Sequence, residues 1–437
     1  MKVLAIFITK TATFLLKLIH RGGSLPGQLG QKVCKDILNK LEIKGSIILV
    51  TGTNGKTSTS NMITELFHQA NKKVISNRKG DNLQAGIITT LLNAASFSGK
   101  IKCDYVVLEV DELNIPYIMK SLPVDTLVVT NFFRDQLDRS KEMEQLIVKI
   151  EKATQDFSGN LVLNGNDPNV VRLQDVATKA KCSYFGIDAC DTSTTISTEA
   201  SEGKFCPRCK QRLSYTYYQY SHIGMFSCNS CDFQTPKLQV CLQPKNIEKR
   251  EFTFQNKKFT APQGGLYTMY NCAAVLLVAK LYKIPDTFVE RAFSNISIPD
   301  GRNETIQFSN TSCVLNLIKN PTGANEVMKV INEDLTDKAI LIVLNDQAQD
   351  GTDVSWIYDT HFEKLINDHT KKIIFSGSRA YDIALRLKYA GYTNEMEIYE
   401  SLDEAVSKFK ILPYNLYAVT TYTALQPTRK LLRRDHS

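Results

Sequence analysis

TGTNGKTST, residues 51–59, follows directly on the apolar run Ser46–Val50 and decides the fold of the chain around it. The pattern predicts a strand that ends in a glycine-rich turn and continues into a helix, so that several backbone N–H groups point to one place and can bind phosphate. We therefore predict an ATP or GTP site in the turn and the first helical residues. That site comprises Gly52, Thr53, Asn54, Gly55, Lys56, Thr57 and Ser58.

Two side chains of this motif can act on a bound nucleotide. Lys56 can place its ammonium against the terminal phosphates, and Thr57 offers a hydroxyl to a Mg²⁺ ion. The position five residues before Gly55 is Val50 rather than glycine, so the motif is a shorter form of the usual phosphate-binding loop. A plain turn before a helix would explain the glycines, but it does not predict the Lys–Thr pair.

Length and composition indicate an ordinary globular protein of about two or three domains. The chain has 437 residues, of which 43% are hydrophobic and 22% are charged. Its 53 Lys and Arg exceed its 45 Asp and Glu, and the net charge of +8 suits anionic ligands such as nucleotides but is too diffuse to indicate nucleic acid. Seven of the eleven cysteines are scattered singly, which favours a reducing, cytoplasmic location.

The N-terminal segment, residues 1–45, is predicted to begin with an amphipathic helix. Lys10 and Lys17 interrupt its apolar stretch and no clear small-residue cleavage site follows, so an amphipathic helix fits the segment better than a secretion signal. Packing of this helix against the sheet is favoured. The open alternative is peripheral contact with the inner face of the plasma membrane, with apolar side chains dipping inward. Those side chains are Phe7, Phe14 and Leu18.

Four further cysteines form two CxxC pairs and predict a structural metal site. Eighteen residues separate Cys206 and Cys209 from Cys228 and Cys231, and this spacing lets two turns supply four thiolates to one tetrahedral Zn²⁺. Four thiolates leave no open position for a nucleophile. Disulfides are the alternative, which a reducing compartment disfavours. Aromatic and polar residues alternate between the pairs as in a hairpin, so we predict a zinc ribbon inserted at residues 203–236.

An acidic cluster follows the next predicted strand, Tyr105–Leu108. A carboxylate at the carboxyl end of a parallel strand beside the phosphate loop is well placed to hold Mg²⁺, and Glu109 is the first choice and Asp111 the second. The alternative is a group of solvated acids that begin a helix. Asn82 and Arg134, near predicted strand ends and loops, are candidates for substrate contacts.

Strands and helices alternate along most of the chain, which predicts an α/β fold with parallel sheets. A doubly wound sheet belongs to a central ATP-binding domain at residues 46–298. A second, Rossmann-like sheet is predicted in a C-terminal α/β domain at residues 299–437. Its strands are expected at Cys313–Leu317, Ala339–Leu344 and Lys372–Phe375.

These motifs, in this order, resemble the Mur ligase family, the ATP-dependent enzymes that extend the peptidoglycan stem peptide, together with the related folylpolyglutamate synthases. The resemblance rests on GTNGKTST, on the strand-end Glu109 and on TNFFRDQLDR at residues 130–139. Further matches are Asn271, Gly301-Arg302 and Asn320-Pro321. The resemblance implies a Mur ligase-like central phosphate-loop domain, with Asn271 and Arg302 among the nucleotide-binding residues.

Three departures from the family pattern narrow the expected activity. Gln136 stands where amino-acid-adding members have a histidine that helps bind a second Mg²⁺, and Lys319 replaces another family histidine. Only about forty-five residues precede the phosphate-loop strand in this sequence, so the family's usual domain that grips a UDP-linked precursor is not expected here. This chain is therefore not expected to recognise a UDP-sugar in the ordinary way.

A short N-terminal helix, the inserted ribbon and the loop VLNDQAQDGTDVSWIYD, residues 343–359, resemble the members of the family that amidate the stem peptide. This implies ATP-dependent amidation of the α-carboxyl of D-glutamate in lipid II or lipid I to D-isoglutamine, through an acyl phosphate. Lys56, Glu109 and Asp353 would be catalytic. Ammonia would come from a GatD-type glutaminase subunit in a heterodimer, since the chain has no convincing Cys–His glutaminase signature of its own.

Two other functions stay open. An amino-acid-adding ligase of the Mur or folylpolyglutamate type would incorporate an amino acid into its product and need no glutaminase. A non-catalytic, nucleotide-binding zinc-ribbon adaptor would bind nucleotide without releasing ADP in response to substrate. The combination of Lys56, Thr57 and Glu109 weighs against the adaptor.

Overall fold

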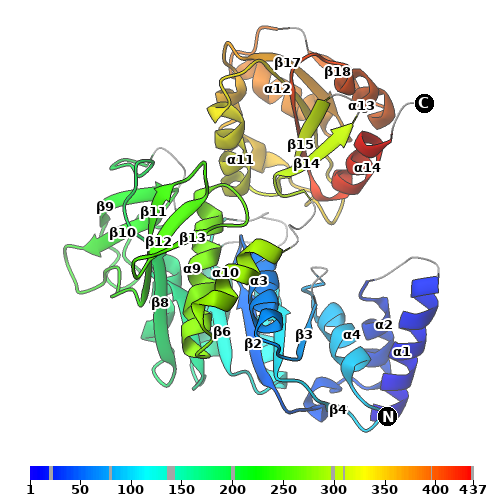
Figure 1. The fold of residues 1–437 in the computed structure, drawn as a ribbon, viewed down its shortest axis with the longest axis vertical. Coiled ribbons are helices and arrows are strands. Elements are labelled where there is room, and N and C mark those ends of the chain that lie inside the picture. The colour runs from blue at the N-terminus through cyan, green and yellow to red at the C-terminus, as the bar shows by residue number, and fades with distance from the viewer. Residues whose placement is uncertain are drawn as a thin grey trace. The chain divides into compact units, whose positions relative to one another are not determined.

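The computed structural model describes residues 1–18, 23–77, 81–134, 143–197, 202–296, 301–308, 311–394 and 396–434. The chain divides into two compact units. The first unit comprises Met1–Phe132 and Glu144–Ser297, and the second comprises Phe133–Met143 and Ile298–Ser437. Each unit contains its own large sheet (Figure 1). The predicted domain boundary between residues 298 and 299 lies outside the described residues.

The first unit contains a nine-stranded sheet. Its strands are β2 (Ser46–Thr51), β3 (Val74–Ser76), β5 (Tyr105–Glu109), β6 (Thr126–Val129), β7 (Asn160–Asn164), β8 (Lys181–Ile187), β11 (Val240–Asn246), β12 (Glu251–Phe254) and β13 (Lys257–Thr260). They lie in the order β13-β12-β11-β8-β7-β6-β2-β5-β3, and the pairs from β3 to β11 are parallel. The middle strands are almost wholly buried, as expected of a parallel sheet that helices cover on both faces.

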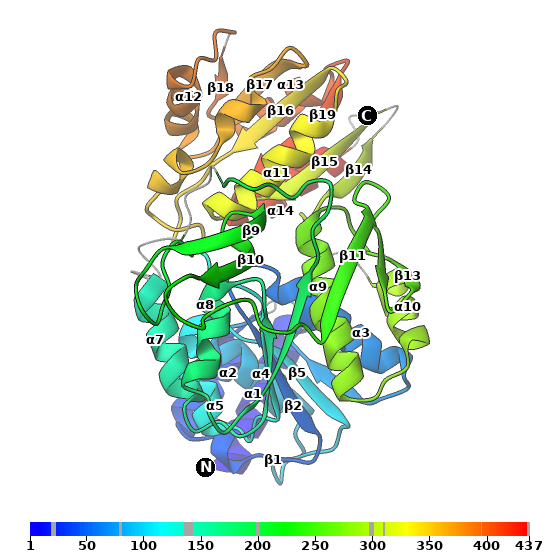
Figure 2. The ribbon, with the colours of Figure 1, turned by 90° about the vertical axis from the view of Figure 1, so that its left-hand side faces the viewer.

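Helices lie on both sides of this sheet (Figure 2). On one side are α3 (Lys56–Gln69), α9 (Leu266–Leu281) and α10 (Asp286–Asn295); on the other are α5 (Ile115–Ser121) and α7 (Met143–Thr154). Thirteen of the sixteen residues of α9 are buried, which makes it a core helix. The doubly wound arrangement predicted for this region is therefore confirmed.

The N-terminal helix α1 (Lys2–Leu18) packs chiefly on two other helices, α2 (Leu25–Val33) and α4 (Gln84–Ala94). Its inner face buries Ala5, Ile6 and Thr9, and Thr9 Oγ1 donates a hydrogen bond of 3.2 Å to the carbonyl of Pro26. The predicted packing is confirmed, but its main partners are helices rather than the sheet. Short elements nearby are η1 (Leu38–Lys40), β1 (Glu42–Ile43) and β4 (Lys100–Ile101), the last two paired in parallel.

A hairpin interrupts the first unit between β8 and β11. Its strands β9 (Leu213–Tyr220) and β10 (Ile223–Cys228) pair antiparallel, as the alternation of aromatic and polar residues predicts. Hydrogen bonds tie it to the end of β8 and to the turn after β7. Tyr217 OH donates to the carbonyl of Ile187 (2.9 Å), and Gly224 N donates to that of Asn166 (2.9 Å). The short helices α8 (Pro168–Val171) and η3 (Arg172–Asp175) lie between β7 and β8 in the chain.

The second unit contains a six-stranded sheet in the order β14-β15-β19-β16-β17-β18. Its strands are β14 (Glu304–Phe308), β15 (Thr311–Leu317), β16 (Lys338–Val343), β17 (Thr370–Ser376), β18 (Glu397–Tyr399) and β19 (Asn415–Thr420). All pairs are parallel except β14 with β15. The three strands predicted here are β15, β16 and β17, with ends that differ by one or two residues.

Alternate residues of β16 face two separate cores. Ile340 and Ile342 join a cluster with α11 (Pro321–Glu333), α12 (Ala380–Tyr389), η4 (Ser355–Tyr358) and η5 (Phe362–Leu365). Ala339 and Leu341 join the cluster of α13 (Leu402–Lys410) and α14 (Tyr422–Arg433) on the opposite face. The sheet is thus covered on both sides, as predicted for a Rossmann-like domain.

The turn that leads into β16 depends on one carboxylate. Asp334 accepts hydrogen bonds from Thr336, Asn415 and Tyr417 at 2.6 to 3.2 Å. Burial alone would raise the pKa of Asp334, but these hydrogen bonds prevail and lower it to about 2. The ionised form is therefore held more strongly in the folded than in the unfolded chain.

Asp334→Asn is expected to lower the free energy of unfolding by about 1–2 kcal/mol near neutral pH, after allowance for partial solvent screening. Because the folded pKa is depressed, the contribution of Asp334 is present above pH ~4 and is lost as the pH falls towards about 2. Urea unfolding of both proteins at several pH values measures this. A difference that stayed constant between pH 7 and pH 3 would contradict the assignment.

Candidate active site

The phosphate loop has the predicted strand–turn–helix form. β2 ends at Thr51 and α3 begins at Lys56, and between them Gly52 and Gly55 have φ of 122° and 84°, which suit glycine. A Cβ on Gly55 would lie 2.3 Å from Asn271 Oδ1. The buried side chain of Asn271, on α9, thus contacts the loop directly, and the structure brings this residue to the predicted nucleotide site.

The residues that follow β6 hold the phosphate loop in shape. The backbone carbonyl of Asn131 accepts a hydrogen bond from the amide of Thr53 (2.9 Å), and the side-chain Oδ1 of Asn131 accepts one from the amide of Asn54 (2.9 Å). Thr130 Oγ1 donates to the carbonyl of Asn54 at 2.7 Å. The sequence places polar residues at the carboxyl end of this strand but assigns Thr130 and Asn131 no role of their own. Polar residues at the end of a strand adjacent to the loop were the signal for one.

Lys56 is buried and its ammonium lies over the loop. Nζ donates to the carbonyls of Gly52 (2.6 Å) and Thr53 (3.3 Å), and both carboxylate oxygens of Glu112 lie 3.2 Å away. Both side chains of the ion pair are less than a tenth exposed, so the two charges compensate each other in a setting of low dielectric. Glu112 begins η2 (Glu112–Asn114), and the sequence alone does not predict its contact with Lys56.

Glu109 has the surroundings of a cation ligand. It ends β5 directly beside Val50 of β2, and its side chain is 2% exposed. Asn82 Nδ2 donates to Oε1 at 2.8 Å, whereas Oε2 is buried and has no hydrogen-bond partner within the described parts of the chain. A buried carboxylate oxygen without a partner is costly, and a divalent cation would satisfy it. The residue therefore fits the predicted Mg²⁺ role.

The alternative of a solvated acidic cluster does not describe this strand end, because Glu109 and Glu112 are buried. Asp111, the second choice for the metal, accepts from the amide of Leu113 at 3.1 Å and so caps η2. Asn82 donates to Glu109 and so supports this acid. Its predicted contact with substrate stays a prediction. Gln136 lies outside the described residues.

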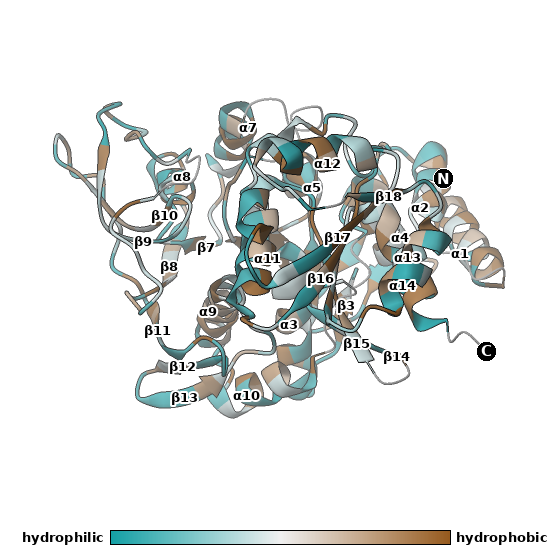
Figure 3. Cartoon of the chain, turned by 90° about the horizontal axis from the view of Figure 1, so that it is seen from above, coloured by the Kyte–Doolittle hydropathy of each residue, from teal (hydrophilic) through white to brown (hydrophobic). Residues whose placement is uncertain are grey.

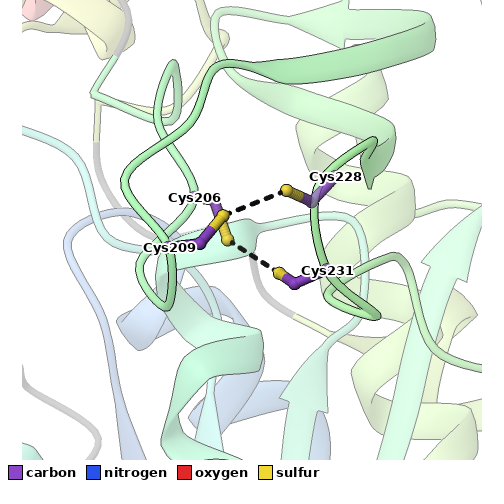
Figure 4. Close-up of side chains that lie close together, drawn as sticks. All are labelled: Cys206, Cys209, Cys228 and Cys231. Carbon is purple, nitrogen blue, oxygen red and sulfur yellow. Dashed lines mark hydrogen bonds between the residues drawn. The ribbon is translucent and has the colours of Figure 1, made fainter.

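The four paired cysteines converge as predicted (Figure 4). Sγ of Cys206 lies 3.6 Å from that of Cys231, Cys209 lies 3.4 Å from Cys228, and all four sulfurs are within 4.8 Å of one another. A tetrahedral Zn²⁺ with bonds of about 2.3 Å requires sulfurs about 3.8 Å apart, whereas a disulfide requires about 2.05 Å. The cysteines are free, so the arrangement fits a metal and not disulfides.

A backbone amide also contacts one sulfur of this cluster. The amide of Ser230 points at Cys228 Sγ from 3.4 Å, and this hydrogen bond lowers the pKa of Cys228 to about 7. By contrast, burial raises the pKa of the scattered Cys241 to about 11. What sets the clustered cysteines apart from Cys241 is their position, because their four sulfurs lie within 4.8 Å of one another and can bind one cation together.

Asp353 belongs to the second unit, in the loop after β16. The amide of Ser355 donates to its Oδ1 at 2.8 Å and lowers the pKa of Asp353 below its usual value. Another acid of the loop is structural, because Asp350 is buried and accepts from Thr423. Arg302 precedes β14 in the same unit. The roles of Asp353 and Arg302 in a site with the phosphate loop stay predictions.

The resemblance to known proteins extends over both units. Residues 50–279 match the family model of the Mur ligase middle domain, and residues 317–425 match that of the MurT ligase C-terminal domain. A subunit MurT of lipid II isoglutaminyl synthase (glutamine-hydrolyzing) from Staphylococcus aureus is 33% identical over 95% of this chain and 94% of its own length. The corresponding subunit from Streptococcus pneumoniae is 30% identical over 98% and 96%.

Solved structures share the fold at lower identity. A pseudomurein peptide ligase type C from Methanothermus fervidus has a TM-score of 0.67 at 18% identity, covering 91% of this chain and 80% of that one. MurF ligase from Thermotoga maritima, solved in complex with ADP, has a TM-score of 0.58 at 13% identity, covering 93% and 82%. The architecture of both units is therefore one on which peptide ligases are built.

Proposed function

Because the chain belongs to the Mur ligase family, and within it to the MurT subunits of lipid II isoglutaminyl synthase, we propose that it amidates the stem peptide of lipid II. The product would be D-isoglutamine, formed at the α-carboxyl of D-glutamate. The observation that carries this proposal is the 33% identity to a MurT subunit over 95% of the chain. The buried Lys56 and Glu109 beside one phosphate loop support it.

The proposed chemistry proceeds in two steps. The γ-phosphoryl group of ATP is transferred to a carboxylate oxygen of the glutamate, which gives an acyl phosphate and ADP. Ammonia then attacks the carbonyl carbon, the bond to the phosphate oxygen breaks, and loss of a proton leaves the carboxamide. The activation is required because an unmodified carboxylate resists attack by ammonia.

The residues of the first unit would bind and neutralise the phosphates. The amides of the loop and the Lys56 ammonium would hold the transferred group, and a triphosphate would compete with Glu112 for that ammonium. Members of the family use ATP and Mg²⁺. Thr57 and Glu109 would hold Mg²⁺, which when bound neutralises charge on the phosphates. Asn271 and Arg302 are proposed to complete the nucleotide site.

The four clustered cysteines would hold a structural Zn²⁺ that stabilises the hairpin without entering the reaction. Their four sulfurs lie within 4.8 Å of one another, and four thiolates complete the tetrahedral coordination of Zn²⁺, which supports this part of the proposal. The enzyme would work in the cytoplasm, at the inner face of the membrane that carries its lipid-linked substrate, with a GatD-type glutaminase as the partner that supplies ammonia.

Asp353→Asn is expected to abolish amidation driven by glutamine while leaving amidation driven by ammonium within about threefold of the wild type. We propose that this carboxylate, held ionised by Ser355, completes the Cys–His pair of the glutaminase, where an amide would favour the wrong histidine tautomer by analogy with a catalytic triad. Product formation with each nitrogen source measures the effect. Equal loss with both sources would instead assign Asp353 to orienting ammonia.

The proposed function is tested by mass spectrometry of lipid II incubated with the chain, ATP, Mg²⁺ and ammonium chloride. Conversion of one carboxyl to a carboxamide is expected. Incorporation of an added amino acid, with ADP release, would replace the proposal with the amino-acid-adding ligase. Nucleotide binding with no substrate-dependent ADP release would favour the adaptor.

A further inference from the structure

The outward face of α1 is apolar except for the exposed Thr11 near its middle. Phe7 is 54% exposed, and Phe14 and Leu18 are each 63% exposed. Three more exposed apolar residues share this face: Val3, Leu4 and Leu15. At 100° per residue these positions fall within about one third of the helix circumference. A helix that faced water there would present polar side chains, so this face is suited to contact with an apolar phase.

The same helix is fixed to the first unit through its other face. Besides the bond of Thr9 to Pro26, Asn93 Nδ2 on α4 donates to Thr13 Oγ1 at 3.1 Å, and Lys10 Nζ donates to the carbonyl of Asn93 at 2.9 Å. A Cβ on Gly30 of α2 would lie 2.2 Å from Thr9 Oγ1, so the helices meet closely. The apolar stripe is therefore held in place and directed outward.

Positive charge accompanies this stripe. Lys10 and Lys17 lie beside one edge of it by helical position, and Lys10 Nζ is 5.9 Å from the centre of the exposed Phe97 ring. The first acidic residue of the chain is Asp36. Six basic residues come before it: Lys2, Lys10, Lys17, Arg21, Lys32 and Lys35. Cations next to an apolar stripe complement a surface of anionic headgroups above acyl chains.

Within the described residues, none of the helices is long and apolar enough to cross a bilayer. Figure 3 shows apolar colouring along much of α1, and Figure 1 shows α1 as the outermost of the helices α1, α2 and α4 in its unit. A short amphipathic helix with these features lies in the plane of a membrane surface rather than spanning it.

We propose that α1 binds the surface of a bilayer containing anionic lipids, with Phe7, Phe14 and Leu18 among the acyl chains and the lysines at the headgroups. The inference rests on the proposed function in one respect, since it is a lipid-linked substrate that would make such binding useful. Membrane binding would confine the enzyme to the surface where that substrate resides and so raise the rate of encounter.

The test is co-sedimentation of the full chain with phosphatidylglycerol vesicles, without ATP or lipid II. The wild type is expected to bind these anionic vesicles. Binding should be weaker with phosphatidylcholine vesicles, and it should also weaken at high salt concentration. Phe7→Gln/Phe14→Gln/Leu18→Gln should reduce vesicle binding at least about tenfold, since three large apolar groups are lost. The matched control is Ile196→Gln/Leu335→Gln/Ile411→Gln, which removes three apolar side chains that are 73 to 75% exposed elsewhere and should bind normally.

Equal binding by the wild type and the α1 variant, or none by either, would overturn the proposal. A dimer of the wild type that the α1 variant abolishes, without vesicle binding, would also overturn it and assign the face to a second copy of the chain. Amidation of detergent-solubilised lipid II separates this inference from the proposed function. The α1 variant should retain that activity, whereas a wild type that bound vesicles but failed to amidate would refute the function alone.

Discussion

Lys56→Met is expected to lower ATP-dependent amidation of lipid II by at least about 10³-fold with ammonium as nitrogen source. The ammonium is placed by the carbonyls of Gly52 and Thr53 at the start of α3, where it would neutralise charge that builds up on the phosphates as the phosphoryl group moves. Methionine keeps the length and the apolar stem but not the charge. Single-turnover formation of the carboxamide measures the effect.

The same substitution should also destabilise the first unit, and this effect must be separated from catalysis. Loss of Lys56 leaves the Glu112 carboxylate buried without its cation, which costs about 3–5 kcal/mol. Adding Glu112→Gln to Lys56→Met should restore most of that stability while the activity stays absent. A double variant that regained more than a tenth of wild-type activity would show that Lys56 acts only by maintaining the fold.

The parts of the site that follow one another in the chain could be predicted from the sequence. The turn from β2 into α3 is encoded within residues 51–59, and the spacing of each CxxC pair forms its own turn. Parallel strands explain the placement of Glu109 beside the loop, because strands of this kind end at the same edge of a sheet. In these cases local geometry or a general rule of topology was sufficient.

Contacts that depend on tertiary packing could not be predicted in this way. Glu112 follows Glu109 by three residues, and only the path of the turn between β5 and η2 decides which acid faces Lys56. Asn271 reaches Gly55 because α9 packs on α3, and the sequence indicated this only through the family resemblance. Amphipathicity likewise predicted that α1 would pack, but it did not identify α2 and α4 as its partners.

Removal of the proposed zinc is expected to unfold the hairpin around β9 and β10 while the rest of the first unit stays folded. The apolar cluster of this region is small: Val171, Cys206, Leu213, Phe226, Cys228 and Phe233. Two of its members are themselves metal-ligand candidates, so a bound metal would replace the core that the segment lacks. Structural zinc sites contribute about 10–16 kcal/mol of apparent binding free energy in small domains, far more than such a cluster can supply.

Cys231→Ser tests this without a chelator. The purified wild type should contain one zinc per chain by elemental analysis, and the variant should lose the metal and the amide protection of the hairpin in hydrogen exchange. Cys241→Ser is the matched control, because Cys241 is outside the cluster and burial keeps it a thiol. Full zinc content in Cys231→Ser would exclude a four-thiolate site. Protection of β2 and α3 should survive in both variants, since the hairpin is inserted after the strands and helices that build the phosphate loop.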